Sequence, residues 1–497
     1  MAAETFAFNH LGIDLNTNDT HANASVQWIK SDYPRCSLNK RLRENPYESL
    51  SGNEKKYSDI SVKSLKANAK LVIGSIIELN NFLDEQLEGN PELQEKLSVD
   101  LVSGGPPCQS FSMAGLRQKD NHRNRLPWEF ARFVNHAKPK IVLLENVSGI
   151  LRAFHQDGNE YHAWKEVAKA FSSIGYAPIC IHANAKYVGV PQNRPRFLMF
   201  AIRKDLLKNI SNADFTNEEL KALNLAIRTL SKNFNWEYYR YWDVTNIKDS
   251  TLFNGKVFSS LRTHSSVEQW VPSKAALRDF ERSPDDTNLE YNYAENINKL
   301  FGNSVPRDEI KNTQLRKHGE RVKQRFRLYQ ALETIGERSL VSKIKNTHKT
   351  NYIEATELAS SLSNEKLLFA NENTLRVARD SSEIVELILG LATKKHSQRA
   401  LVAEAPAPAA LSIPDDCCHY SSNELRTLSV REVARLQSFP DSFEFRSKVT
   451  TGGENRKFEV PQYTQAGNAV PPLLARSAAI VVEQLIHRLT KTEQASS

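Results

Sequence analysis

A cysteine in a proline-rich turn has the type and setting of a covalent nucleophile. Cys108 lies in the segment VDLVSGGPPCQSFSMAG, directly after a short apolar run and inside a Gly-Gly-Pro-Pro turn. A free cysteine is often only a small core hydrophobe. Here two prolines fix the backbone at the end of a predicted strand, a position that presents a thiol instead of burying it. We therefore expect Cys108 to act as a nucleophile.

Two further segments place charged side chains at the ends of predicted strands. Glu145 closes the apolar run of LLENVSG, where an acidic residue needs a partner, such as a helix cap or a cation, or a chemical role. Arg194 and Arg196, in VPQNRPRF, precede another strand, in which alternate residues point to the same side. An Arg-x-Arg pair by itself indicates little, because surface arginines are common.

The elements that must position these residues alternate between strand and helix. Apolar residues at helical spacing predict one helix from Leu126 up to Pro139 and another from 164 to 175. Strands are expected at 13–17, 69–73, 99–102, 140–144, 178–183 and 197–202, and a further helix at 22–30. This alternation is typical of an α/β sheet with helices on both faces. Ligands of such sheets bind beyond the carboxyl ends of the strands, where Asp19, Ser75, residues 104–109 and Glu145 fall.

Basic residues are unevenly distributed along the chain. The 497 residues include 66 Lys and Arg against 58 Asp and Glu, a formal net charge of +8. Residues 301–350 contain nearly all of this excess, which indicates either a solvated helix face or a contact for a polyanion. A hydrophobic content of 40% excludes wholesale disorder, and the lack of an eighteen-residue apolar run predicts no membrane span.

Five cysteines without a Cys-x-x-Cys pair predict neither a disulfide framework nor a zinc site, so no metal is expected. The start MAAETFAFNHLGIDL lacks the basic and apolar regions of a secretory signal, and we expect a cytoplasmic protein.

The chain is predicted to have three parts. Residues 1–203 and 425–497 have the strand and helix rhythm of one domain, and a last helix is expected at 472–489. Residues 204–424 are polar, basic and without that rhythm, which predicts a second domain of mixed structure. Within it the stretch AEAPAPAALSIP at 403–414 has the composition of a linker.

Five segments in this order resemble the motifs of the cytosine-C5 DNA methyltransferase family. They are PPCQSFS, ENV, QNRPR, LSVREVARLQSFPDSFEF and QAGNAVPPLLARSAA, and the resemblance covers residues 3–203 and 426–484. It implies a Rossmann-like methyltransferase sheet that uses S-adenosylmethionine. It also implies that the block 204–424 is a target-recognition domain for double-stranded DNA.

The resemblance assigns a chemical role to each motif. Cys108 would add as a thiolate to carbon 6 of cytosine, so that carbon 5 can take a methyl group. Glu145 would bind ring N3 and the 4-amino group, and Arg194 would hold the O2 edge. The residues implied to support the loop and the base pocket are Pro107, Gln109, Asn146, Gln192 and Arg196. Because a stacked base cannot admit a thiol, the target cytosine would leave the duplex.

The resemblance also implies a cofactor site and a DNA contact. The residues implied for S-adenosylmethionine are Asp19 at the ribose, Ser75 at the adenine, Pro106, Asn468 and Val470. The segment KNTQLRKHGERVKQRFR would contact phosphates through Arg321, Lys323 and Arg325. The family's opening strand and Phe-x-Gly-x-Gly-Gly turn have no counterpart here. We expect a truncated start, because Cys108, Glu145 and Arg194 are retained; loss of the loop is the alternative.

Two other functions stay open at this point. An RNA-directed relative acting on tRNA would have a short recognition region, so the long block 204–424 argues against it. A DNA-binding relative that lacks the glycine loop would bind DNA but no cofactor. The preferred reading is a monomeric enzyme of a restriction-modification or orphan methylation system, in the first case beside a separate restriction endonuclease.

Overall fold

The computed structural model forms two compact units. It describes residues 2–15, 26–29, 60, 71–107, 125–156, 159–277, 293–302, 305–335, 352–371, 374–391, 398–409, 413–414, 417–451 and 459–490. One unit, here called the sheet unit, comprises Phe6–Gly189, Arg194–Val267 and Leu473–Ser497. The other, called the second unit, comprises Met1–Thr5, Val190–Asn193 and Glu268–Pro472.

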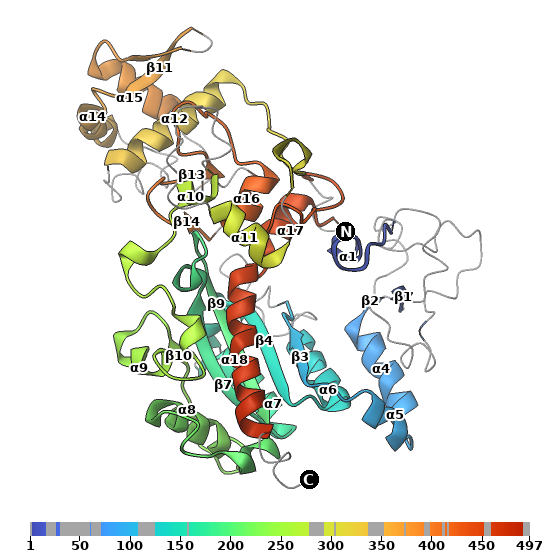
Figure 1. Cartoon of the computed structure of the whole chain (residues 1–497). Coiled ribbons are helices and arrows are strands. Elements are labelled where there is room, and N and C mark those ends of the chain that lie inside the picture. The colour runs from blue at the N-terminus through green and yellow to red at the C-terminus, as the bar shows by residue number, and fades with distance from the viewer. Residues whose placement is uncertain are drawn as a thin grey trace. The chain divides into compact units, whose positions relative to one another are not determined.

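A five-stranded sheet with the order β10-β7-β9-β4-β3 forms the centre of the sheet unit (Figure 1). Its strands are β3 (Leu101–Gly104), β4 (Ile141–Val147), β7 (Tyr176–Asn184), β9 (Pro195–Arg203) and β10 (Trp242–Asp243). β3 is parallel to β4 and β10 to β7, whereas β9 is antiparallel to both of its neighbours. The sheet is therefore mixed, and the start of β9 lies at the edge where β4 ends.

Helices cover both faces of this sheet, as the sequence predicts. On one face lie α6 (Leu126–Ala137) and α7 (Ala163–Ser173), which match the two predicted apolar stripes. They share a buried core with the sheet that includes Phe130, Val134, Val167, Phe171, Val142, Leu144, Phe197 and Met199. On the other face Phe200 packs against Phe258 with ring centroids 6.1 Å apart.

The last helix, α18 (Pro472–Thr490), lies in front of the sheet in Figure 1. Asn209 Nδ2 donates to the carbonyl of Leu489 at 2.9 Å, and Ser260 Oγ to that of Ser477 at 2.8 Å. In the described residues, Gln462–Thr490 is the one helical segment long and apolar enough to cross a membrane. Core helices satisfy the same composition test, and α18 buries Ala478, Val481 and Leu485.

The N-terminal part differs from the sequence prediction. β1 (Val26–Trp28) pairs in parallel with β2 (Leu71–Ile73), so the predicted helix at 22–30 is wrong at these residues. Pairing with a distant strand here overrides a local helical pattern, because propensity is a weak prior. Residues 13–15 are not a strand, and the rest of the strand expected at 13–17 lies outside the described residues. After β2 follow α4 (Ile76–Leu87) and α5 (Pro91–Lys96).

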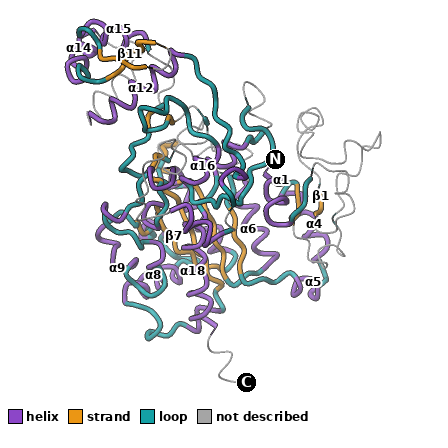
Figure 2. Tube along the Cα trace, turned by 45° about the horizontal axis from the view of Figure 1, so that its top comes forward, coloured by secondary structure: helices purple, strands orange, loops and turns teal. Residues whose placement is uncertain are grey.

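The second unit combines helices with small two-stranded sheets (Figure 2). α12 (Glu320–Ile335), α14 (Tyr352–Ser361), α15 (Ser381–Gly390) and the antiparallel strands β11 (Lys366–Asn371) and β12 (Thr374–Val377) share one hydrophobic core. The unit also contains α11 (Tyr293–Phe301), α16 (Val430–Leu436) and α17 (Gln462–Asn468). The core shared by α12, α14, α15, β11 and β12 therefore consists of residues of the second unit alone.

The compact units do not follow the boundaries expected at 203/204 and 424/425. Residues 204–267 belong to the sheet unit, to which they contribute β10, α8 (Asn217–Arg228) and α9 (Ser250–Phe253). The linker expected at 403–414 is wrong for its described residues. There β14 (Ala407–Pro408) pairs with β8 (Gln192–Asn193), and the carbonyl of Ala405 accepts from Ser273 N at 2.9 Å. Small residues allow this close packing, which composition cannot distinguish from a linker.

Candidate active site

A carboxylate and two arginines lie at the edge of the sheet where β4 ends. The register places Glu145 opposite Leu198 and Val147 opposite Arg196, and alternate strand residues share a face. Glu145 and Arg196 therefore lie on the same side, where Arg196 Nε is 2.7 Å from Glu145 Oε1. Arg194 interacts electrostatically with both. The sequence analysis named all three residues, and the antiparallel course of β9 brings them together.

Burial dominates the electrostatics of this cluster. Arg194 is only 2% exposed and Arg196 7%. Burial raises the pKa of Glu145 above its usual value, although the charges of Arg196 and Arg194 act in the opposite direction. Burial likewise lowers the pKa of Arg194 and of Arg196. The site thus favours a Glu145 carboxyl that takes up a proton more readily than a carboxyl in water.

The turn after β3 packs directly against this cluster. A Cβ atom added at Gly105 would lie 3.1 Å from Glu145 Oε2, so the glycine leaves room for the carboxylate. Asn146 Nδ2 donates to the carbonyl of Pro106 at 2.9 Å, and Asn146 Oδ1 accepts from Val147 N at 2.9 Å. The Gly-Gly-Pro-Pro turn and the ENV segment are therefore packed together and joined by a hydrogen bond. Pro107 follows and is exposed. Cys108 and Gln109 lie outside the described residues.

Asn184, at the end of β7, is a positioning residue that the sequence analysis missed. Its Oδ1 accepts from Arg194 N at 3.1 Å and from Lys186 N at 3.3 Å. The carbonyl of Arg194 in turn accepts from Ala185 N at 3.0 Å. An asparagine between a strand and a turn commonly bonds to nearby backbone, which was the available signal.

The other predicted base-pocket and cofactor residues lie at several places. Gln192 is fully buried in β8 of the second unit, and neither of its amide atoms bonds to a residue that the structure describes. Ser75 follows β2 and caps α4, because its Oγ accepts from Ile77 N at 3.2 Å. Asn468 ends α17 and is exposed, and Val470 is half-buried, both in the second unit. Asp19 lies outside the described residues.

The LSVREVARLQSFP segment is fixed by buried ionic groups. Arg435 bonds to both carboxylate oxygens of Asp441, at 2.8 and 2.7 Å, and Arg426 binds both oxygens of Glu432 at 2.8 Å. Arg431 donates instead to three backbone carbonyls, those of Lys311, Pro440 and Phe443. The three arginines of this segment therefore have a structural role, because each of them fixes α16 or the loop that follows it.

Two of the three predicted DNA-contacting residues hold a helix end. Arg321 and Arg325 donate to the carbonyls of Gly390 and Leu391, at 2.6 and 2.9 Å, where α15 ends. Cations are favourable at a helix C-terminus, where carbonyl groups lack helical partners. Lys323 lies between them in sequence and lines a cavity instead. The basic residues of this stretch therefore do not all have the same role.

Comparisons with known proteins identify the family of this chain. The C-5 cytosine-specific DNA methylase family matches residues 52–484. The type II methyltransferase M.DdeI of Desulfomicrobium norvegicum is 28% identical over 77% of this chain and 72% of its own length. The type II methyltransferase M.Bpa9945I of Bacillus paralicheniformis is 26% identical over 81% and 74%, respectively. The orphan methyltransferase M.SPRI of Bacillus phage SPR is 34% identical over 34% and 39%.

The chain is also similar to the crystal structure of a DNA modification methyltransferase encoded within an E. coli prophage. The two share 20% identity over 87% of this chain and 91% of the other, with a TM-score of 0.37.

The family match covers most of the length of the chain and defines a class of methyl-transferring enzyme. The chain belongs to the C-5 cytosine-specific DNA methylase family and is a DNA cytosine methyltransferase.

Proposed function

We propose that this enzyme transfers a methyl group from S-adenosylmethionine to carbon 5 of a cytosine that has left the duplex, within a short DNA site. The observation that supports this most directly is the buried cluster of Glu145, Arg194 and Arg196 beside the turn that leads to Cys108. A flipped base needs one donor for its ring N3 and another for its O2 atom. In this cluster the protonated Glu145 carboxyl can donate to N3, and the Arg194 guanidinium can donate to O2.

Each residue has a defined task in this proposal. The Cys108 thiolate forms a bond to carbon 6, while the Glu145 carboxyl donates its proton to ring N3 and so neutralises the charge that develops. Its raised pKa suits a group that must hold this proton before reaction. Arg194 donates to the O2 edge. After methyl transfer the C5 proton passes to a water molecule acting as base, the sulfur–carbon bond breaks to return the Cys108 thiolate, and N3 returns its proton to Glu145, which releases 5-methylcytosine.

S-adenosylmethionine would supply the electrophilic methyl group when bound. Among the described residues, Ser75 and Pro106 follow the ends of β2 and β3, where α/β sheets bind ligands. The Pro106 carbonyl, which accepts from Asn146, has a second lone pair. This acceptor fits a ligand with amino and hydroxyl groups. Asp19, Asn468 and Val470 are proposed to complete the site.

The test is base-resolution methylation sequencing of DNA from a methylation-free bacterial host that expresses this chain. We expect 5-methylcytosine in one sequence context, and none with Cys108→Ser, which should still bind DNA. Soluble wild-type protein without methylation would contradict the proposal. Tight DNA binding without binding of S-adenosylmethionine in calorimetry would then favour the DNA-binding relative, and methylation of isolated tRNA but not plasmid would favour the RNA-directed one.

The biological setting is proposed from the relatives' names, two of which are type II methyltransferases and one an orphan methyltransferase. We propose a monomer in the cytoplasm, in a restriction-modification system with a separate endonuclease or as an orphan enzyme. An endonuclease encoded beside this chain that cleaves the same site only when it is unmethylated would support the first setting. Size-exclusion chromatography with light scattering tests whether the chain is a monomer, and cell fractionation tests whether it is cytoplasmic.

A further inference from the structure

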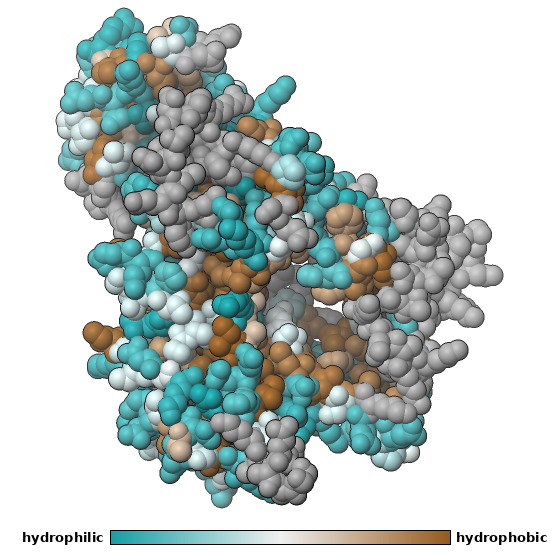
Figure 3. All heavy atoms as spheres, viewed as in Figure 1, coloured by the Kyte–Doolittle hydropathy of each residue, from teal (hydrophilic) through white to brown (hydrophobic). Residues whose placement is uncertain are grey.

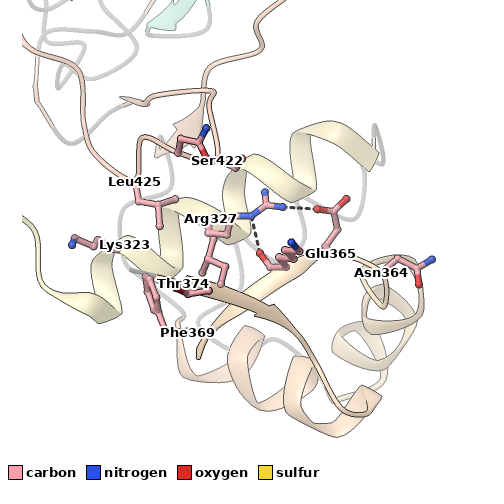
Figure 4. A pocket seen from close by; sticks show the side chains of 11 residues that line it. Lys323, Arg327, Asn364, Glu365, Phe369, Thr374, Ser422 and Leu425 are labelled. Atoms are coloured by element: carbon pink, nitrogen blue, oxygen red, sulfur yellow. Dashed lines mark hydrogen bonds and ion pairs between the residues drawn. The ribbon is translucent and has the colours of Figure 1, made fainter. Parts of the chain in front are cut away.

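A polar cavity of about 670 Å³ lies within the second unit. Its walls come from α12, residues 364–365, the strands β11 and β12, and residues 422–425 (Figure 4). The surface over α14, α15 and β11 is largely hydrophilic in Figure 3, at the upper left of the view. Ligand sites in proteins have volumes of about 300–1,000 Å³, so one nucleotide fits this cavity.

The cavity is held in shape by buried bonds. Arg327, 8% exposed, donates through Nε to the carbonyl of Lys366 at 2.8 Å and pairs with Glu365 at 2.5 Å. Figure 4 shows this pair at the centre of the lining residues. Gln330 Nε2 donates to the carbonyls of His419 and Ser421, both at 2.8 Å, and so fixes the loop before Asn423. Binding here would not have to order Arg327 or the backbone at Lys366, His419 and Ser421, because these bonds already hold them.

Other lining groups are available to a ligand. The side chains of Lys323, Asn364 and Asn423 make no hydrogen bond or ion pair with any residue that the structure describes. Since Arg327 and Glu365 neutralise each other, Lys323 and Lys366 leave the cavity with a positive charge. Phe369 and Leu425 add apolar surface. A phosphate, a flat ring and a polar base edge match this combination.

We propose that this cavity holds one nucleotide of the recognition sequence other than the methylated cytosine. Lys323 contacts its phosphate, and the Asn423 amide reads its base edge. An asparagine amide matches the N6 and N7 atoms of adenine with two hydrogen bonds, so the base is adenine. This proposal rests on the proposed function only in that the chain acts on duplex DNA.

The experiment is selection of bound duplexes from a randomised pool by the full-length chain, which needs no methyl transfer. The variants are Asn423→Ala and Lys323→Gln. The matched controls are Asn296→Ala, on the exposed face of α11 in the same unit, and Lys317→Gln, which is exposed in the same basic stretch and does not line the cavity. All four positions are at least partly exposed, so folding should be retained, and thermal unfolding verifies this.

We expect the wild-type consensus to contain an adenine at which Asn423→Ala loses roughly 5- to 150-fold preference, while Asn296→Ala keeps it. Lys323→Gln should weaken binding to every sequence, more than Lys317→Gln does. An unchanged consensus with Asn423→Ala would overturn the proposal. So would saturable binding of dAMP without DNA that Asn423→Ala removes, because the cavity would then serve a free nucleotide. The duplex selection can give the expected adenine even if methylation sequencing detects no 5-methylcytosine. Methylation can likewise be detected even if the selection shows no such adenine.

Discussion

A single methyl group added at Gly105 tests whether the position of the Glu145 carboxylate controls catalysis. Gly105 does not have a positive φ, so alanine is compatible with its backbone. The new Cβ would lie 3.1 Å from Glu145 Oε2, whereas ordinary contacts begin at 3.4 Å. The carboxylate must therefore move by about 0.3 Å, since the backbone of the proline-rich turn is the stiffer partner.

The size of the effect follows from this displacement. A misplacement of 1 Å at a reacting group costs about 100-fold, so a shift of about 0.3 Å costs roughly fourfold, or about 0.8 kcal/mol. Gly105→Ala should thus lower kcat/KM about fourfold in a methyl-incorporation assay with saturating cofactor. Its unfolding temperature should change little, because the site is partly open at Gly105.

Gly104→Ala is the matched control. Its Cβ would lie 2.7 Å from Cε2 of Phe130, in the core under α6. Overpacking of this kind costs about 1–3 kcal/mol, which lowers Tm by roughly 2–12 °C. Gly105→Ala should therefore lower activity without lowering stability, whereas Gly104→Ala should lower stability. A Gly105→Ala enzyme with wild-type kcat/KM, or one that is destabilised as much as Gly104→Ala, would refute the reasoning.

Three further predictions concern charged residues. Glu145→Gln should reduce kcat about 10²–10⁴-fold. Because burial raises the pKa of Glu145, its stabilising contribution is present below its unfolded value of 4.5 and is lost as pH rises through the folded pKa. Urea unfolding should therefore show wild type losing stability relative to Glu145→Gln above pH 4.5; parallel curves would contradict this. Arg435→Ala, which leaves Asp441 buried and unpaired, should cost about 3–5 kcal/mol, and Arg435→Met with Asp441→Leu much less. Equal losses in the two proteins would argue against a buried ion pair. Arg325→Ala should cost about 1–2 kcal/mol through the end of α15, whereas Lys323→Gln should leave stability unchanged and reduce the salt dependence of DNA binding by about 0.9 log unit. An unchanged salt slope would mean that Lys323 contacts no phosphate.

The residues of the candidate site could be named from the sequence because their chemistry is local. Glu145 ends an apolar run and Arg194 precedes another, so each lies at a strand end whatever the sheet's topology. The helices α6 and α7 were predictable for a similar reason, since their buried stripes repeat at helical spacing. The supporting bond from Asn184 to the backbone of Arg194 was not predicted, because it joins two strand ends across a turn.

The sequence by itself determined which residues carry charge and thiol, where the helices α6, α7 and α18 run, and which family the motifs resemble. Tertiary structure decided the rest. The antiparallel placement of β9 brings Arg196 to Glu145, and the short parallel pair β1–β2 replaces an expected helix. Residues of the expected linker form β14, which pairs with β8. Arg321 and Arg325 bind carbonyl groups at the end of α15. The physical reason is the same in each case: strand pairing and burial depend on partners far along the chain, which local patterns do not specify.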